Sequence, residues 1–182
     1  MWTLLVALVA AAPPVALPKV GSCPSGYSTS GDYCHPGSSA RYAVVKVGTC
    51  PSGYSTSGDY CLAGRDDTPV AVAKGGSCPS GYSTSGDYCL ASSRTVEAPA
   101  ELPATAVGKV GTCPSGYHTS GDYCSPGSSA RYALAKVGVC PSGYSTSGDY
   151  CLAGSTARHA LAKTGVCPSG YQTSGDYCLS GR

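Results

Sequence analysis

The sequence contains no Phe, Ile or Asn, and it has one Trp and one Met among 182 residues. Leu and Val are sparse, and several of them lie within the first nine residues. A chain this poor in large apolar side chains cannot build an ordinary hydrophobic core. The absence of Asn also excludes N-glycosylation, because the acceptor motif begins with that residue.

Charge is scarce as well, with 12% charged residues and a formal net charge of +2. Disordered chains combine low hydrophobicity with high net charge, so this balance does not fit a charged, disordered tail. It also gives no basic footprint for nucleic acid or for a membrane surface, and we expect neither as a partner.

The plentiful residue is cysteine, with twelve copies. Small exported domains that cannot bury enough apolar surface are stabilised by disulfides instead. Residues 1–16 form an apolar run followed by small residues and proline, which predicts a signal peptide and a secreted or periplasmic protein. The apolar run is too short to span a membrane.

An internal repeat dominates the remaining sequence. The motif Lys-x-Gly-x-Cys-Pro-Ser-Gly-Tyr-x-Thr-Ser-Gly-Asp-Tyr-Cys occurs six times and contains every lysine and every cysteine. Residues 19–64 also closely match residues 109–154, which indicates duplication of a three-unit block. The expected repeat units are 19–35, 46–62, 74–90, 109–125, 136–152 and 163–179.

The segments between the units are rich in Ala, Ser, Gly, Pro and Arg, and the longest is a Pro/Ala-rich linker at 91–108. This composition is typical of flexible linkers. The stretch at 130–136 could instead be a strand that leads into the next unit.

Turn residues suggest how one unit folds. Cys23-Pro24-Ser25-Gly26 predicts a type I turn, and Thr29-Ser30-Gly31 predicts a three-residue hairpin loop that places Tyr27 opposite Tyr33. The segment before Cys23 would then return beside the strand of Cys34. We therefore expect a small, disulfide-rich all-β fold of six tandem hairpin or three-stranded units joined by flexible linkers.

The constant Cys-x10-Cys spacing predicts a disulfide within each unit. Metal-thiolate binding and modification of the cysteines are the alternatives, although no tight metal-binding pair is present. The expected bridges are Cys23–Cys34, Cys50–Cys61, Cys78–Cys89, Cys113–Cys124, Cys140–Cys151 and Cys167–Cys178.

One bridge is worth about 3 kcal/mol, which leaves a unit marginally stable unless neighbours share surface. Unequal linkers favour independent beads, and a stacked solenoid is the alternative.

Two tyrosines in each unit are the main candidates for a functional surface. They could pack against each other across the hairpin, or they could form an exposed face for contact with sugars or surfaces or for oxidative cross-linking. The candidate contact residues are Tyr27, Tyr33, Tyr54, Tyr60, Tyr82, Tyr88, Tyr117, Tyr123, Tyr144, Tyr150, Tyr171 and Tyr177.

No other residues suggest catalysis. His35, His118 and His159 occupy unrelated positions, and one Asp per unit supplies too few oxygens for a calcium site. Asp32 is expected to accept hydrogen bonds from turn amides, and Lys19 and Asp32 to form a solvated pair. We expect no enzyme activity, cofactor or metal.

The string Cys-Pro-Ser-Gly-Tyr resembles the Cys-Pro-x-Gly-Tyr turn of EGF-like modules, although those modules carry six cysteines. The whole unit, with Lys-Val-Gly-Ser-Cys before this string and Ser-Gly-Asp-Tyr-Cys after it, resembles repeats of uncharacterised bacterial exported proteins. That resemblance implies export and no particular activity. The expected function is structural, or multivalent binding to an envelope or extracellular polymer. The alternative is a precursor or metal-handling protein that uses its cysteines.

Overall fold

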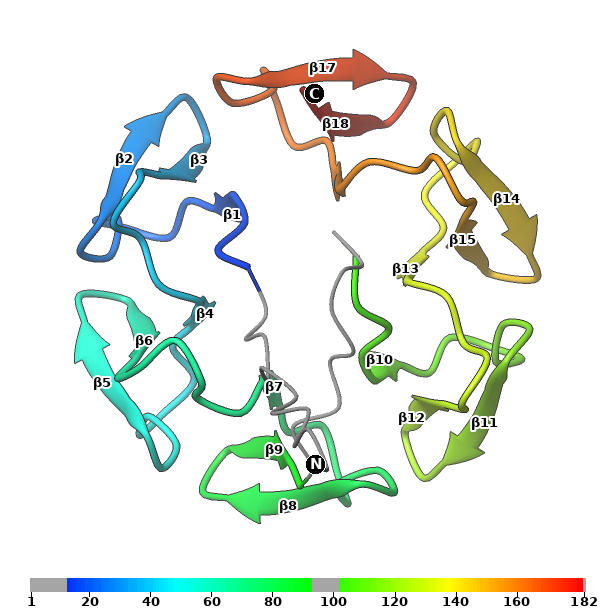
Figure 1. The fold of residues 1–182 in the computed structure, drawn as a ribbon, viewed down its shortest axis with the longest axis horizontal. Helices are drawn as coiled ribbons and strands as arrows, with labels where there is room; N and C mark the ends of the chain where they lie inside the picture. Colours follow the sequence, from blue (N-terminus) through cyan, green and yellow to red (C-terminus); the bar gives the residue numbers. More distant parts are fainter. Residues whose placement is uncertain (1–12, 93–101, 182) are drawn as a thin grey trace, which may run out of the picture.

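The computed structural model describes residues 13–92 and 102–181, which form a ring of six small β-sheets, here called blades 1 to 6 (Figure 1). Residues 1–12, which hold most of the predicted signal peptide, and 93–101, part of the predicted linker, lie outside the described residues. The expected all-β fold of six tandem three-stranded units is confirmed.

Each blade has an inner strand near the ring axis, a middle strand and an outer strand (Figure 1). The inner strands are β1 (Leu17–Pro18), β4 (Ala43–Val45), β7 (Ala71–Ala73), β10 (Val107–Gly108), β13 (Ala133–Ala135) and β16 (Ala160–Ala162). The outer strands are β2 (Tyr27–Ser30), β5 (Tyr54–Ser57), β8 (Tyr82–Ser85), β11 (Tyr117–Ser120), β14 (Tyr144–Ser147) and β17 (Tyr171–Ser174). The middle strands are β3 (Tyr33–Pro36), β6 (Tyr60–Ala63), β9 (Tyr88–Ala91), β12 (Tyr123–Pro126), β15 (Tyr150–Ala153) and β18 (Tyr177–Ser180).

The chain passes through each blade in the order inner, outer, middle, and both strand pairings are antiparallel. In blade 1 the inner strand pairs Leu17 with Cys34. The inner strands therefore come from residues that precede the repeated lysine, so the expected unit boundaries cut one strand off every blade. In blade 5, β13 lies within residues 130–136, as the alternative interpretation of that stretch predicted.

The hairpin differs from the expected one. Ser30 pairs with Tyr33, so the loop is the two residues Gly31 and Asp32, and Tyr27 pairs with Pro36. Gly31 has φ +59°, whereas no residue other than glycine has a positive φ among those described. A positive φ at the first loop position alone is typical of a type II′ turn, which suits the twist of a hairpin. The predictions of a three-residue loop and of a pair between Tyr27 and Tyr33 are therefore wrong.

The first turn of the unit is also shifted by one residue. The Tyr27 N–H donates to the Pro24 carbonyl at 3.0 Å, and Gly26, at the third turn position, has φ +86°. A glycine with positive φ at that position defines a type II turn, so the predicted type I turn at 23–26 is wrong.

The blades are not independent beads. Hydrogen bonds join neighbouring blades, including the Ser25 N–H to Ser57 Oγ at 2.9 Å between blades 1 and 2. The same bond joins blade 6 to blade 1, from the Ser169 N–H to Ser30 Oγ at 2.8 Å, and closes the ring. Closure lets every blade bury both faces, which a single unit is too small to do for itself.

The core consists of the layers between blades. The layer between blades 2 and 3 packs Cys61 and Val44 of one blade against Tyr88 and Leu90 of the next. Each inner strand also begins at or directly after a buried alanine, whose small side chain lets the blades approach: Ala16, Ala43, Ala71, Ala106, Ala133 and Ala160.

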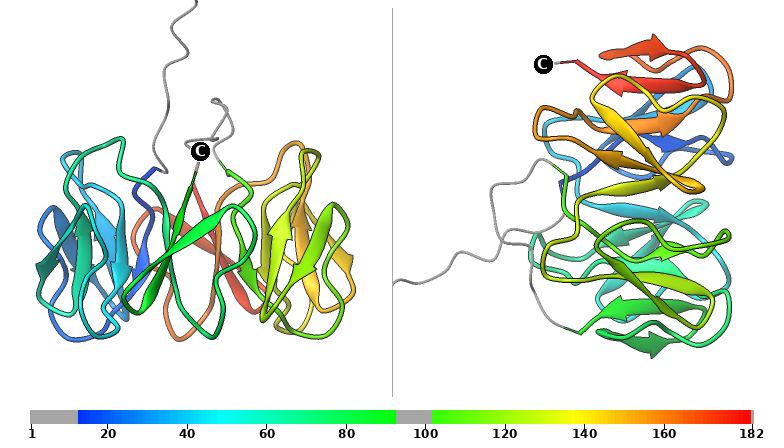
Figure 2. Two further views of the ribbon diagram at one scale, coloured as in Figure 1. Left: turned by 90° about the horizontal axis from the view of Figure 1, so that it is seen from below. Right: turned by 90° about the vertical axis from the view of Figure 1, so that its right-hand side faces the viewer.

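The ring has two different ends (Figure 2). The connection end carries the segments that link one blade to the next, such as 37–42 and 64–70. The turn end carries the Gly-Asp hairpin turns and the Lys-x-Gly segments that follow the inner strands. These two names are used below.

Candidate functional site

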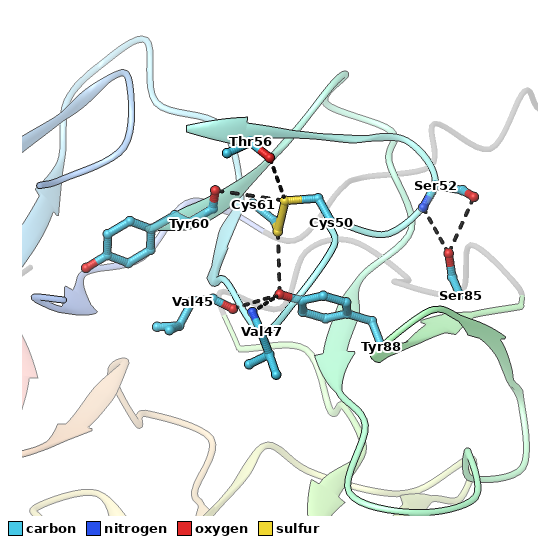
Figure 3. The surroundings of a disulfide bond; sticks show 9 residues. All are labelled: Val45, Val47, Cys50, Ser52, Thr56, Tyr60, Cys61, Ser85 and Tyr88. Carbon is cyan, nitrogen blue, oxygen red and sulfur yellow. Dashed lines mark hydrogen bonds between the residues drawn. A yellow bond between two sulfur atoms is a disulfide. The ribbon is translucent and has the colours of Figure 1, made fainter. Parts of the chain in front are cut away.

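The second tyrosine of each unit joins neighbouring blades and is not a surface residue. Tyr88 is fully buried, and its hydroxyl accepts a hydrogen bond from the Val47 N–H at 2.5 Å and donates to the Val45 carbonyl at 3.1 Å (Figure 3). The same pair of bonds recurs between all neighbouring blades. The tyrosines that make these bonds are Tyr33, Tyr60, Tyr88, Tyr123, Tyr150 and Tyr177. Their candidacy as surface contacts is wrong, because each of these side chains is buried between its own blade and the preceding one.

All twelve cysteines form the six disulfides predicted within units, and the predicted pairing is confirmed. The bridge of one blade lies against the buried tyrosine of the next, with Tyr88 Oη 3.4 Å from Cys61 Sγ (Figure 3). Disulfides within a chain are typical of proteins that fold in an oxidising compartment.

The repeated aspartate also contacts a neighbouring blade. A Cβ on Gly21 would lie 2.0 Å from Asp59 Oδ2, so the carboxylate packs directly on this glycine of the preceding blade. The arrangement recurs up to the closing pair, Asp32 and Gly165. The repeated lysines are exposed at the same end and form no ion pair among the residues that the structure describes: Lys19, Lys46, Lys74, Lys109, Lys136 and Lys163. The predicted surface pair of Lys19 and Asp32 is therefore not formed.

The first tyrosine of each unit is half-buried and reaches toward the start of the next inner strand. Tyr27 Oη donates to the Arg41 carbonyl at 2.9 Å, and Tyr54 Oη donates to the Pro69 carbonyl at 2.8 Å. Burial raises the pKa of Tyr27 and of Tyr54 above the ordinary value for a phenol. These side chains are neutral at physiological pH. The six are Tyr27, Tyr54, Tyr82, Tyr117, Tyr144 and Tyr171.

Three further aromatic side chains join this set, each directly before an inner strand. Tyr42 and Tyr132 come from opposite blades, and burial raises the pKa of both, that of Tyr132 to about 12. His159 Nδ1 lies 3.1 Å from Tyr171 Oη, and burial lowers the pKa of His159 to about 4. We call Tyr42, Tyr132, His159 and the six first tyrosines the aromatic cluster.

Arginine and lysine are segregated between the two ends. The described arginines, Arg41, Arg65, Arg131 and Arg158, all lie in connections between blades. Among the described residues of the connections, the only negative charges are those of Asp66 and Asp67. At the turn end the charges balance, because every blade contributes one lysine and one aspartate. The connection end is therefore the positive end of the described ring.

A 390 Å³ cavity opens at the connection end, between the segments that lead into blades 2 and 3. Its lining combines Arg41, Arg65, Asp66 and Tyr42 with Pro13 and Pro14, which precede β1. The Arg41 guanidinium donates to the Gly64 carbonyl, which fixes its orientation beside the cavity.

The described residues contain no group of three or more His, Cys, Asp or Glu side chains placed to hold a metal ion. His35 and His159 each contact Tyr171, whereas His118 is exposed on an outer strand. The described part of the chain also contains no helix that is long and apolar enough to cross a membrane.

The sequence analysis missed the inner strands, the aromatic residues directly before them, and the cavity. The signal for the inner strand was present, because an alanine stands three residues before the repeated lysine in every copy, as in Ala43 and Lys46. Extending the unit to that alanine would have shown Tyr42, Tyr132 and His159 at equivalent positions.

No protein-family model, no curated protein and no solved structure matches this chain. The residues of the ring alone therefore carry the functional argument.

Proposed function

We propose that the protein is an exported, non-enzymatic ring that binds an anionic envelope or extracellular polymer through its connection end. The observation that carries this proposal is the gathering of all described arginines at the end that holds the aromatic cluster and the cavity. Guanidinium groups bind carboxylates and phosphates through paired hydrogen bonds, and aromatic rings contact the apolar faces of sugars.

In a closed ring, multivalent binding differs from that of six flexible beads. Six flexible beads would rebind independently, whereas the blades here are fixed in one body. The second tyrosine of each unit is buried in a contact between blades and is not available to a ligand. The connection end instead offers the arginines of several blades at fixed spacing to neighbouring groups on one polymer. A polymer that binds at several points dissociates more slowly than a single sugar.

The alternative of a precursor or metal-handling protein gains less support. It needs reactive thiols, and none of the described cysteines is free. Thiolate, and not a disulfide, is the ligand that soft metals require.

Export is supported by the disulfides and by the apolar start of the sequence. Ala16 was counted within the predicted signal peptide, yet it is fully buried in blade 1. Removal of the signal must therefore leave Ala16 in the mature chain.

The test is retention on immobilised polysaccharides. We expect the protein to be retained on polygalacturonate and not on neutral cellulose, with retention falling as salt rises. The triple variant Arg41→Gln, Arg131→Gln, Arg158→Gln should lose most of this retention. The matched control carries the same charge change at the turn end, in Lys46→Gln, Lys136→Gln, Lys163→Gln, and should be retained like the parent. Equal loss in both variants would mean that net charge, and not the connection end, determines binding.

A further inference from the structure

The cavity lies between connections of blades 1 to 3, the first half of the ring. Blades 4 to 6 form the duplicated second half, but different residues stand there at part of the lining. Residues 36–43 and 126–133 are identical, and both supply Ser, Arg and Tyr at matching positions. The second wall of the cavity differs between the halves. Arg65, Asp66 and Thr68 form it in the first half, where Ser155, Thr156 and Arg158 stand in the second.

The two arginines that line the cavity, Arg41 and Arg65, differ in burial and in their hydrogen bonds. Arg41 is half-buried and held by the Gly64 carbonyl, so its remaining N–H groups point from a fixed position. Arg65 is exposed on a tight turn, in which Thr68 Oγ1 accepts from the Arg65 N–H at 3.0 Å and donates to the Arg65 carbonyl at 2.8 Å. The Arg41 guanidinium is thus fixed in advance, whereas the Arg65 side chain extends from an exposed turn.

The remaining lining fits a polyhydroxylated ligand. Asp66 can accept hydrogen bonds from hydroxyl groups, and the Ser38 hydroxyl can donate or accept. The Thr68 hydroxyl, which already donates to the Arg65 carbonyl, can only accept. The ring of Tyr42 supplies an apolar surface, and its hydroxyl reaches the Ala71 carbonyl at 3.5 Å. A cavity of 390 Å³ lies within the size range of small-molecule sites.

We propose that this cavity is a single binding site for a carboxylated sugar, a uronic acid residue, with Arg41 and Arg65 on the carboxylate and Asp66 on the ring hydroxyls. This inference rests on the proposed function, because it names the sugar that the connection end recognises. One ring then holds one specific site, and the other arginines contribute only general attraction to the polymer.

The experiment is a titration of the disulfide-bonded protein, beginning no later than Pro13 so that the whole cavity lining is present, with tetragalacturonate, followed by amide NMR. We expect one site, with shifts confined to residues 38–42 and 64–68. The fully methyl-esterified tetramer, which has no charge, should bind at least about tenfold more weakly.

Two variants adopt the residues of the second half. Arg65→Ser and Asp66→Thr should each weaken binding about tenfold while the melting temperature is unchanged, because both positions are exposed. Arg131→Ser, at the position equivalent to Arg41, is the matched control and should bind like the parent.

Shifts outside the cavity, equal affinity for the methyl ester, or an unchanged Arg65→Ser would overturn the inference. If polygalacturonate still retains the protein in that case, the proposed function stands and only the specific site is wrong. If retention also fails, both are wrong.

Discussion

The closing contact between blades 6 and 1 gives the sharpest test of the ring. Tyr33 Oη donates to the Ala162 carbonyl at 3.0 Å and accepts from the Thr164 N–H at 2.9 Å, across 129 to 131 residues of sequence. In Tyr33→Phe both backbone groups lose this partner. Ala162 and Thr164 are exposed, so water replaces part of the lost bonding and the expected cost is about 1–2 kcal/mol.

The internal contact made by Tyr88 is the matched comparison. Tyr88→Phe removes the same two bonds between blades 2 and 3, which are neighbours along the chain. A closed ring predicts equal losses of stability for the two variants. Tyr42→Phe is the control with little effect, because its hydroxyl makes only a weak bond of 3.5 Å.

The assay is calorimetry without reductant. In a domain of this size 1 kcal/mol corresponds to about 2–4 °C, so both variants should melt about 2–8 °C below the parent in one transition. The reasoning is refuted if Tyr33→Phe melts like the parent while Tyr88→Phe does not, because the chain would then be an open stack. Two separate transitions would instead indicate that the repeat units unfold as independent beads.

Two further predictions concern the turn end and the aromatic cluster. Gly21→Ala should destabilise the protein by about 1–2 kcal/mol, because φ is +64° there and the new methyl group would overlap the Asp59 carboxylate. Gly108→Ala, where the new methyl group would meet open space, is the control in the same melting assay. The pKa of His159 falls from 6.5 to about 4 on folding, so the unfolded chain binds more protons between these values and stability declines as pH falls through this window. His159→Gln should flatten that part of the curve of melting temperature against pH, whereas His118→Gln, at an exposed position, should not; identical curves for all three proteins would contradict the assigned burial.

Local features of each unit could be predicted from the sequence. The disulfides follow from a constant spacing within a short segment, and the Gly-Asp and Pro-Ser-Gly sequences mark turns. The hairpin register was missed because Ser30 was assigned to the loop. A two-residue loop that begins with Gly31 is an equally good turn signal and leaves Ser30 free to pair with Tyr33.

Contacts between blades could not be predicted in the same way. The hydroxyl of Tyr60 bonds to Pro18 and Val20, 40 to 42 residues away, and nothing near Tyr60 in the sequence indicates that partner. The cavity depends on two connections that meet only after the blades have assembled, so Arg41 and Arg65 gave no motif. Their shared chemistry becomes visible only in the ring.

The ring also shows where its two duplicated halves meet. The residue after the second cysteine is a buried leucine in four blades: Leu62, Leu90, Leu152 and Leu179. In the first blade of each half it is polar. Ser125 Oγ donates to the Ser80 carbonyl of blade 3 at 3.2 Å, and His35 lies beside Gly170 of blade 6.

Both junctions between halves therefore bury less apolar surface than the four interfaces within them. Each half of three blades would end in two such faces if it stood alone, and a tandem-repeat stack needs its end faces covered. The duplicated block covers them with a second copy of itself, through bonds such as those of Tyr33 and Tyr123 that are the same at the junctions as elsewhere. At the two junctions, where leucine is absent, these hydroxyl bonds therefore form a larger share of the contacts between blades, although each bond is the same as elsewhere.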